Sequence, residues 1–242
     1  KYIMINIDEV YQKVLALANK EQRGYITPQE FNLYANQAQK DVFNQYFFDL
    51  SQYKRIPSVD TYYSNIDDII DYKISYFKTT DIFVANQGYT MPLGDSNGDG
   101  AAHIITNVGF VDPNTNLIHN AQRVKFEDFS KTNKPPLTRG THSFPNYAIT
   151  SENAVVVFPQ DATTSVSISY IRAPKKPNWQ YVVVNEKPLF DESGAVHFEL
   201  HPSEQKNLIV KILQFAGVGI KDYNIVQAAS QEEVKKIQQE KS

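Results

Sequence analysis

The spacing of apolar residues changes twice along this 242-residue chain. Over the first fifty residues, apolar side chains recur every three to four positions, which is the period of an amphipathic helix. In the central stretch they occur in short runs rich in β-branched and aromatic residues, as in strands, and near the C-terminus the helical period returns. This order predicts an α+β fold in which the terminal helices form one bundle and a central antiparallel sheet or sandwich is inserted between them.

Two helix starts mark the N-terminal segment. Asn6 and Glu9 have capping-box spacing, and Thr27 and Glu30 repeat it, with Pro28 at the first helical position. The apolar face of the first helix comprises Ile7, Val10, Val14 and Leu17, and that of the second Phe31, Tyr34, Ala35, Ala38, Val42 and Tyr46. A helical hairpin is therefore expected over residues 1–52, as the first part of the bundle.

Residues 53–196 are expected to form the antiparallel β insertion, including a proline-rich arm. The runs that predict strands are YKISYFKTTDIFV, AHIITNVGFV, AVVVFP and TSVSISYIRAP. In the last run, Val166, Ile168 and Tyr170 alternate with serines, as in a strand with one solvated face. No pattern of helix length separates the runs, which disfavours a parallel βαβ sheet.

Residues 197–242 are expected to complete the bundle. Pro202 stands at a helix start with Glu204 in its first turn. The broad apolar face that follows comprises Leu208, Ile209, Ile212, Leu213 and Phe215. A further capping box, Ser230 with Glu233, opens a polar tail whose apolar residues are Val234 and Ile237. A helix so short and polar is marginal alone, so it is either frayed or held by another chain.

The charge, the lack of cysteine and the distribution of apolar residues argue against several classes of function. The net charge of −3 and the pI of about 6.0 provide no basic footprint for tight nucleic-acid binding. The chain contains no cysteine, which excludes a disulfide framework and thiolate metal sites. No run of about 18 apolar residues predicts a membrane span, and the opening KYIMINIDEV lacks the pattern of a signal peptide.

The stretch DSNGDG resembles the opening of a calcium-binding loop, because Asp95, Asn97, Asp99 and Gly100 spell D-x-N-x-D-G. Position 12 of such a loop requires a bidentate Glu, and Thr106 stands there instead. The flanking residues also have strand patterns, where an EF-hand has helices. We therefore predict a tight turn between strands rather than a metal site.

Other constellations are too scattered to predict chemistry. The histidines are His103, His119, His142, His197 and His201, and the carboxylate clusters are Asp67, Asp68 and Asp71, Glu127 and Asp128, and Asp191 and Glu192. The histidine spacings match no metal motif and predict surface or capping roles. A glycosidase would need two carboxylates held at about 5–10 Å, and one sequence does not show which converge. No phosphate loop or nucleophile motif is present, so no catalytic, cofactor-binding or metal-binding residue is predicted, and no enzyme.

The stretch IRAPKKPNWQY, residues 171–181, is the one basic cluster with aromatic residues, and it holds the sole tryptophan, Trp179. Basic and aromatic residues together are compatible with nucleic-acid contact. The prolines favour another interpretation, an exposed stiff arm that docks on a neighbouring protein, since Trp, Tyr and Arg anchor protein interfaces.

Three stretches resemble virion structural proteins of tailed bacteriophages, the short-tailed and crAss-like phages in particular. KEQRGYITPQEFNLYANQAQKDVFNQYF (20–47) resembles their N-terminal segment. ISYIRAPKKPNWQY (168–181) resembles their strand followed by a proline-containing arm, and FELHPSEQKNLIVKILQFAGVGIKD (198–222) resembles their C-terminal helix. The central sheet has no part in the resemblance.

The resemblance implies a head-to-tail connector protein, that is, a neck, adaptor or ring subunit docked under the portal. Such proteins form homo-oligomeric rings of about twelve copies with heterologous contacts between subunits. They contact portal and tail proteins, let DNA pass without sequence-specific binding, and reside in the virion after synthesis in the host cytoplasm. No catalytic residue and no cofactor carries over. The alternative is a β-rich module that binds calcium or carbohydrate, with DSNGDG as its metal loop and Trp179 or nearby tyrosines as a stacking platform.

Overall fold

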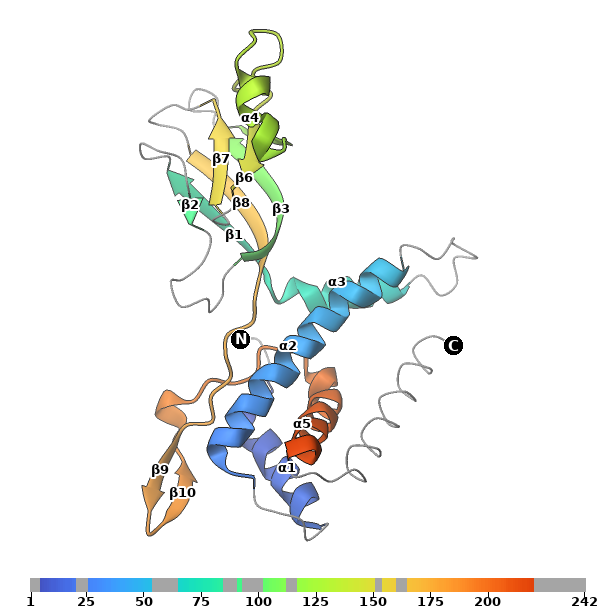
Figure 1. Cartoon of the computed structure of the whole chain (residues 1–242), viewed down its shortest axis with the longest axis vertical. Helices are drawn as coiled ribbons and strands as arrows, with labels where there is room; N and C mark the ends of the chain where they lie inside the picture. Colours follow the sequence, from blue (N-terminus) through green and yellow to red (C-terminus); the bar gives the residue numbers. More distant parts are fainter. Residues whose placement is uncertain are drawn as a thin grey trace. The chain divides into compact units, whose positions relative to one another are not determined.

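The structure, a computed structural model, describes residues 5–20, 26–53, 65–84, 91–92, 102–111, 117–150, 154–159 and 165–219. The chain divides into two compact units (Figure 1). The first comprises Lys1–Tyr76 together with Pro174–Ser242, and the second comprises Phe77–Ala173.

The described part of the first unit is mainly helical. Its helices are α1 (Ile7–Lys20), α2 (Pro28–Tyr53), α3 (Asn65–Ser75) and α5 (Gln205–Gly219). Helix α5 packs against both α1 and α2, and α3 packs against α2 (Figure 1). A short strand pair, β9 (Tyr181–Val184) with β10 (Lys187–Phe190), and two single turns of 3₁₀ helix, η2 (Glu192–Gly194) and η3 (Pro202–Glu204), complete it.

Both predicted helix starts are confirmed by their hydrogen bonds. The Asn6 side-chain oxygen accepts from the backbone N–H groups of Asp8 at 2.8 Å and Glu9 at 3.4 Å. At the start of α2 the bonds are reciprocal: Glu30 Oε2 accepts from the Thr27 N–H at 3.0 Å, and Thr27 Oγ1 accepts from the Glu30 N–H at 3.3 Å. These bonds satisfy N–H groups that have no acceptor inside the helix. The Thr27 N–H and the Thr27 hydroxyl, which both donate to Glu30 Oε2, lower the pKa of the Glu30 carboxyl.

The helical core lies where the apolar stripes of α1, α2 and α5 meet. Its fully buried side chains include Ile7, Val10 and Val14 of α1, Phe31, Ala35, Ala38 and Val42 of α2, and Leu208 and Ile212 of α5. Leu17, expected on the same stripe, is about half exposed at 47%. Truncating a buried Leu or Ile to Ala costs about 2–5 kcal/mol, so the stripes account for much of this unit's stability.

The described part of the second unit contains two four-stranded sheets. One has the order β1 (Lys78–Val84), β8 (Ser165–Arg172), β3 (Ala102–Val111), β4 (Ile118–Asn120), and the other β2 (Met91–Pro92), β7 (Ala154–Phe158), β6 (Asn146–Ile149), β5 (Gln122–Arg123). Side chains from β3, β6, β7 and β8 share one core, so the sheets face each other as in a small sandwich. In β8 the expected alternation is confirmed, because Val166, Ile168 and Tyr170 are buried between partly exposed serines. The α+β fold class is therefore established.

Several details differ from the prediction. Residues 72–75, expected in the first strand, end α3, and the strand begins at Lys78. An eight-residue helix, α4 (Phe126–Asn133), stands between β5 and β6, which pair in parallel, while the other strand pairs are antiparallel. Both helices are short: α4 has eight residues and none of them is buried, and the apolar stripe of α3, with Ile70 and Ile74, extends over only eleven residues, so the sequence pattern missed them.

The sequence predicts a β insertion over residues 53–196, whereas the second unit comprises only Phe77–Ala173. Helix α3 and the β9–β10 hairpin therefore belong to the first unit. Two predictions fall outside the described residues: the turn at DSNGDG and the polar helix from Ser230. No helix within the described residues is long and apolar enough to cross a membrane.

Candidate protein-binding site

A strap of extended chain, residues 174–179, runs from the sheet unit's last strand to the β9–β10 hairpin. The strap is held to α2 by two polar side chains. Gln39, fully buried, donates to the Lys175 carbonyl at 2.7 Å and accepts from the Glu199 N–H at 3.1 Å. Asn32 accepts from the Trp179 N–H at 2.7 Å and donates to the Trp179 carbonyl at 3.2 Å. The strap is therefore held to α2 at two points, Lys175 near its start and Trp179 at its end.

Trp179 lies in the core of the first unit and is only 2% exposed. Its ring centroid is 4.3 Å from that of Tyr11, and it stacks on Tyr181 at 5.7 Å and lies 5.8 Å from Phe190. The indole Nε1–H donates to Asp8 Oδ1 at 2.9 Å. The prediction that Trp179 lies on an exposed arm and anchors a neighbouring protein is therefore wrong, because its ring and its N–H are satisfied within the chain. The same burial prevents it from stacking on a sugar.

The hairpin that follows Trp179 has a tight two-residue turn. Tyr181 pairs with Phe190 at its base and Val184 with Lys187 at its end. The turn residues Asn185 and Glu186 have φ values of 49° and 62°, as a type I′ turn requires. Asn tolerates this left-handed conformation, whereas Glu does so at a cost. A two-residue turn of this type fixes which residues of β9 and β10 pair. At the base of the hairpin, Tyr181 and Phe190 pack against Trp179.

The outer part of the hairpin is apolar on both faces. Side chains of directly paired residues share a face, so Val182 and Leu189 share one face with Val184, and Val183 lies on the other. Val182, Val184 and Leu189 are about half exposed, and Val183 is 67% exposed. An isolated two-stranded hairpin is marginal in water, and exposed contiguous apolar surface marks interaction sites. Figure 1 shows the hairpin projecting from the strap, clear of α1 and α2. We take the hairpin as the candidate protein-binding site.

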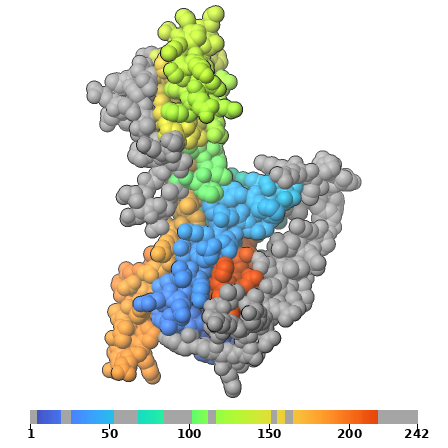
Figure 2. All heavy atoms as spheres, in the orientation of Figure 1, coloured from blue at the N-terminus to red at the C-terminus, as the bar shows by residue number. Residues whose placement is uncertain are grey.

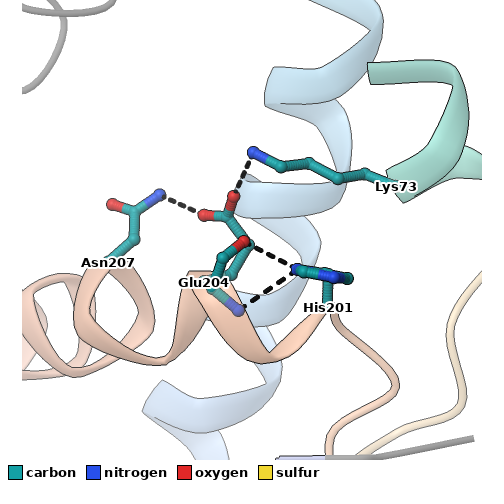
Figure 3. Close-up of polar contacts among 5 residues, drawn as sticks. Lys73, His201, Glu204 and Asn207 are labelled. Carbon is teal, nitrogen blue, oxygen red and sulfur yellow. Dashed lines mark hydrogen bonds and ion pairs between the residues drawn. The ribbon is translucent and has the colours of Figure 1, made fainter. Parts of the chain in front are cut away.

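A second polar cluster joins α3 to the start of α5 (Figure 3). Glu204, 3% exposed, accepts from Lys73 Nζ at 2.7 Å and from Asn207 Nδ2 at 3.0 Å. Lys73 Nζ also lies 5.7 Å from the centre of the Tyr46 ring on α2. The cluster thus ties three helices together, and a buried carboxylate of this kind is stable only when paired.

The structure also places three of the other candidate residues. His201 caps η3 by accepting from the Ser203 N–H at 3.2 Å, and His197 Nδ1 accepts from the Ile7 N–H at 3.3 Å, which confirms capping roles for these two. Asp191 caps η2 through Ser193, whose side-chain and backbone hydrogen bonds lower the pKa of the Asp191 carboxyl. Within the described residues, no three His, Asp or Glu side chains gather as metal ligands.

Sequence reasoning missed Gln39 and Asn32, although one signal was available. Gln39 stands among Ala35, Ala38 and Val42, in the apolar stripe of α2. A polar residue in such a stripe must be hydrogen-bonded when buried, so it indicates a backbone segment docked on the helix. Asn32 lies outside the stripe, and no comparable signal marks it.

Comparisons with known proteins do not assign the chain to a family. A scan against protein-family models finds no match, and a search of curated proteins finds none either. Function therefore has to be argued from the site itself.

Proposed function

We propose that this protein is a structural component of a bacteriophage virion, a ring subunit of the head-to-tail connector that docks to the portal and surrounds the path of the DNA, and that it is not an enzyme. The observation that supports this most is the β9–β10 hairpin. It is anchored at its base by Trp179 and carries apolar side chains on both exposed faces.

A hairpin of this kind suits a ring. In a ring each subunit contributes one surface to its neighbour on one side and a different surface to its neighbour on the other. An apolar element projecting from a rigid base can lie on the next copy and bury both faces there. Burying a half-exposed Val or Leu removes apolar area from water at about 25 cal/mol per Å², so the cluster Val182, Val183, Val184 and Leu189 is suited to drive association.

The overall charge is compatible with a passage for DNA. A net charge of −3 on 242 residues supplies no excess of cations to hold phosphates, and DNA must slide through a connector rather than adhere to it.

The test is the native mass of the purified full chain, with and without a chelator. We expect a ring of about twelve copies that is indifferent to the chelator. Val183→Glu should dissociate the ring, because it buries a charge in the contact. The matched control is Leu33→Glu on α2, since Leu33 and Val183 are both 67% exposed. A chain that stays monomeric, both alone and with purified portal rings, would overturn the proposal, and so would equal sensitivity to the two substitutions.

A further inference from the structure

The β9–β10 hairpin has two outer edges, and a hydrogen bond at its base shows which backbone groups point away from them. The Asp191 N–H donates to the Gln180 carbonyl at 2.9 Å, so these two residues form a hydrogen-bonded pair. Hydrogen-bonded and non-hydrogen-bonded pairs alternate along an antiparallel ladder. The pair of Val183 with Pro188 lies three positions further along, so the backbone groups of both residues point outwards.

The two edges differ in what they offer to another strand. On the β10 edge, Pro188 has no N–H group and Lys187 adds a charge, and both features protect an edge from pairing. The β9 edge, Tyr181–Val184, contains neither a proline nor a charge. Within the described residues β9 pairs only with β10. Figure 2 shows the outer end of the hairpin, in orange, standing clear of the other segments seen in that view. Such an edge favours the addition of a further strand.

The second unit has one described edge strand of sufficient length to pair with β9. Its two sheets end in β1 and β4 and in β2 and β5. Strand β1 has seven residues, whereas β4 has three and β2 and β5 have two each. The four residues of β9 therefore find a partner along their whole length only at β1.

The same alternation shows which groups of β1 point away from its sheet. The Arg172 N–H donates to the Phe77 carbonyl at 2.9 Å, and the pairing of β1 with β8 continues from there without a shift in register. Thr80 and Ile82 therefore lie in non-hydrogen-bonded pairs with β8 and direct their N–H and C=O groups to the outer edge. Within the described residues β1 pairs with β8 alone, so this edge offers both donors and acceptors.

From these matching edges we propose that β9 of one copy adds to the outer edge of β1 on a second copy, antiparallel and with Val183 opposite Ile82. The proposal names the surface that the hairpin binds in the ring proposed above, and it rests on that function. Val183 and Ile82, each 67% exposed, then cover each other on one face of the enlarged sheet. On the other face Val182 lies beside Phe83, which packs against the sandwich core.

Two further observations favour β1 as the partner. Pairing of β9 with β9 of a second copy would join identical surfaces and stop at a dimer, whereas β9 on β1 joins two different surfaces and propagates around a ring. Asp81 is the one acidic residue of β1, and its carboxylate already accepts from the Tyr170 hydroxyl at 2.7 Å. Its charge is therefore engaged within the unit when Val184 lies opposite.

The first test uses disulfide formation between copies, which is clean because the chain has no cysteine. Full-length chains carrying Val183→Cys and Ile82→Cys, one of them with a size tag, are mixed in equal amounts with oxidised glutathione. Opposed residues in a hydrogen-bonded antiparallel pair have Cα atoms about 5.5 Å apart, which a disulfide spans. We expect a covalent pair with one chain of each kind on a non-reducing gel. Leu33→Cys in place of Val183→Cys is the control, since Leu33 is equally exposed, and it should give background only.

The second test addresses the backbone. Val183→Pro removes only the outward N–H group and leaves the bonds of the hairpin, as Pro188 does on the other edge. The Ile82 carbonyl of the next copy then loses its donor, so self-association should weaken about tenfold in sedimentation. Val183→Thr is the matched control. It keeps the N–H group and a β-branched side chain, and it should assemble as the unaltered chain does.

Other results would overturn the contact. A covalent dimer from the Val183→Cys chain alone would show that β9 pairs with β9 and not with β1. If the mixture has the mass of a ring but gives no covalent pair above the Leu33→Cys control, or if Val183→Pro assembles like the unaltered chain, the strand addition is wrong and the ring proposal stands. Both tests use the assembly that the chain forms, alone or on purified portal rings. A chain that is monomeric in both cases removes both proposals.

Discussion

Replacing Asp8 by alanine tests how the hairpin is anchored. Asp8 Oδ1 accepts the indole N–H of Trp179 at 2.9 Å, and the tryptophan is 2% exposed. Leaving a buried donor without its acceptor costs about 1–3 kcal/mol. Asp8 also lies in the first turn of α1, where a negative charge contributes about 0.3–1 kcal/mol. Because Asp8 is itself partly exposed and water can replace some of the bond, we expect a loss of about 2 kcal/mol in the free energy of unfolding.

The assay is urea unfolding followed by fluorescence. Trp179 is the sole tryptophan, so its emission reports on the first unit without a label. The conservative variant Asp8→Asn keeps a side-chain oxygen that can accept from the indole and loses only the charge, so it should cost less than about 1 kcal/mol. The reasoning is refuted if Asp8→Ala is as stable as the unaltered chain. It is also refuted if both variants lose the same stability, because the charge and not the hydrogen bond would then matter.

Three further predictions concern other parts of the chain. Lys73→Met should cost about 3–5 kcal/mol in thermal or urea unfolding, because it leaves the Glu204 carboxylate buried without its cation, and adding Glu204→Leu should recover much of that loss. Burial first, and then the hydrogen bond and charge of Asp81, raise the pKa of Tyr170 to about 12, above its unfolded value of about 10. The folded chain therefore keeps a proton that the unfolded chain loses, so stability should fall between about pH 10 and about pH 12, and Tyr170→Phe should flatten that slope in urea titrations. Calcium at about 5 mM should leave the melting temperature unchanged; a rise that Asp95→Ala with Asp99→Ala abolishes would contradict the predicted turn.

The helix starts were predictable because their signals are local. A capping box consists of two residues three apart, and Thr27 and Glu30 bond to each other whatever the rest of the chain does. The alternation in β8 was predictable for a related reason, since one face of a strand repeats every second residue. Such patterns can be recognised from neighbouring residues alone, without knowing which part of the fold packs against them.

The position of Trp179 was not predictable in the same way. Its stretch is basic, proline-rich and aromatic, which describes an exposed arm equally well. The groups that hold it in place include Asn32 of α2 and Asp8 of α1, both more than 140 residues away in sequence, in addition to the nearby Tyr181 and Phe190. Pairing Lys73 with Glu204 has the same character, with 131 residues between the partners. Long-range contacts of single polar side chains have no period, so one sequence does not reveal them.

The way the second unit is joined to the first bears on whether another domain could replace the second unit. Lys78 of β1 is paired with Ile171 of β8, and the Arg172 N–H donates to the Phe77 carbonyl at 2.9 Å, so the chain enters and leaves the unit through one antiparallel ladder. For the helical unit, the second unit acts as a long connection whose two ends lie together, as the ends of a reverse turn do. The entropy lost in closing such a connection rises only slowly with its length. Any other domain whose two ends lie side by side in this way could take the place of the β-sandwich and leave the connections to the helices as they are.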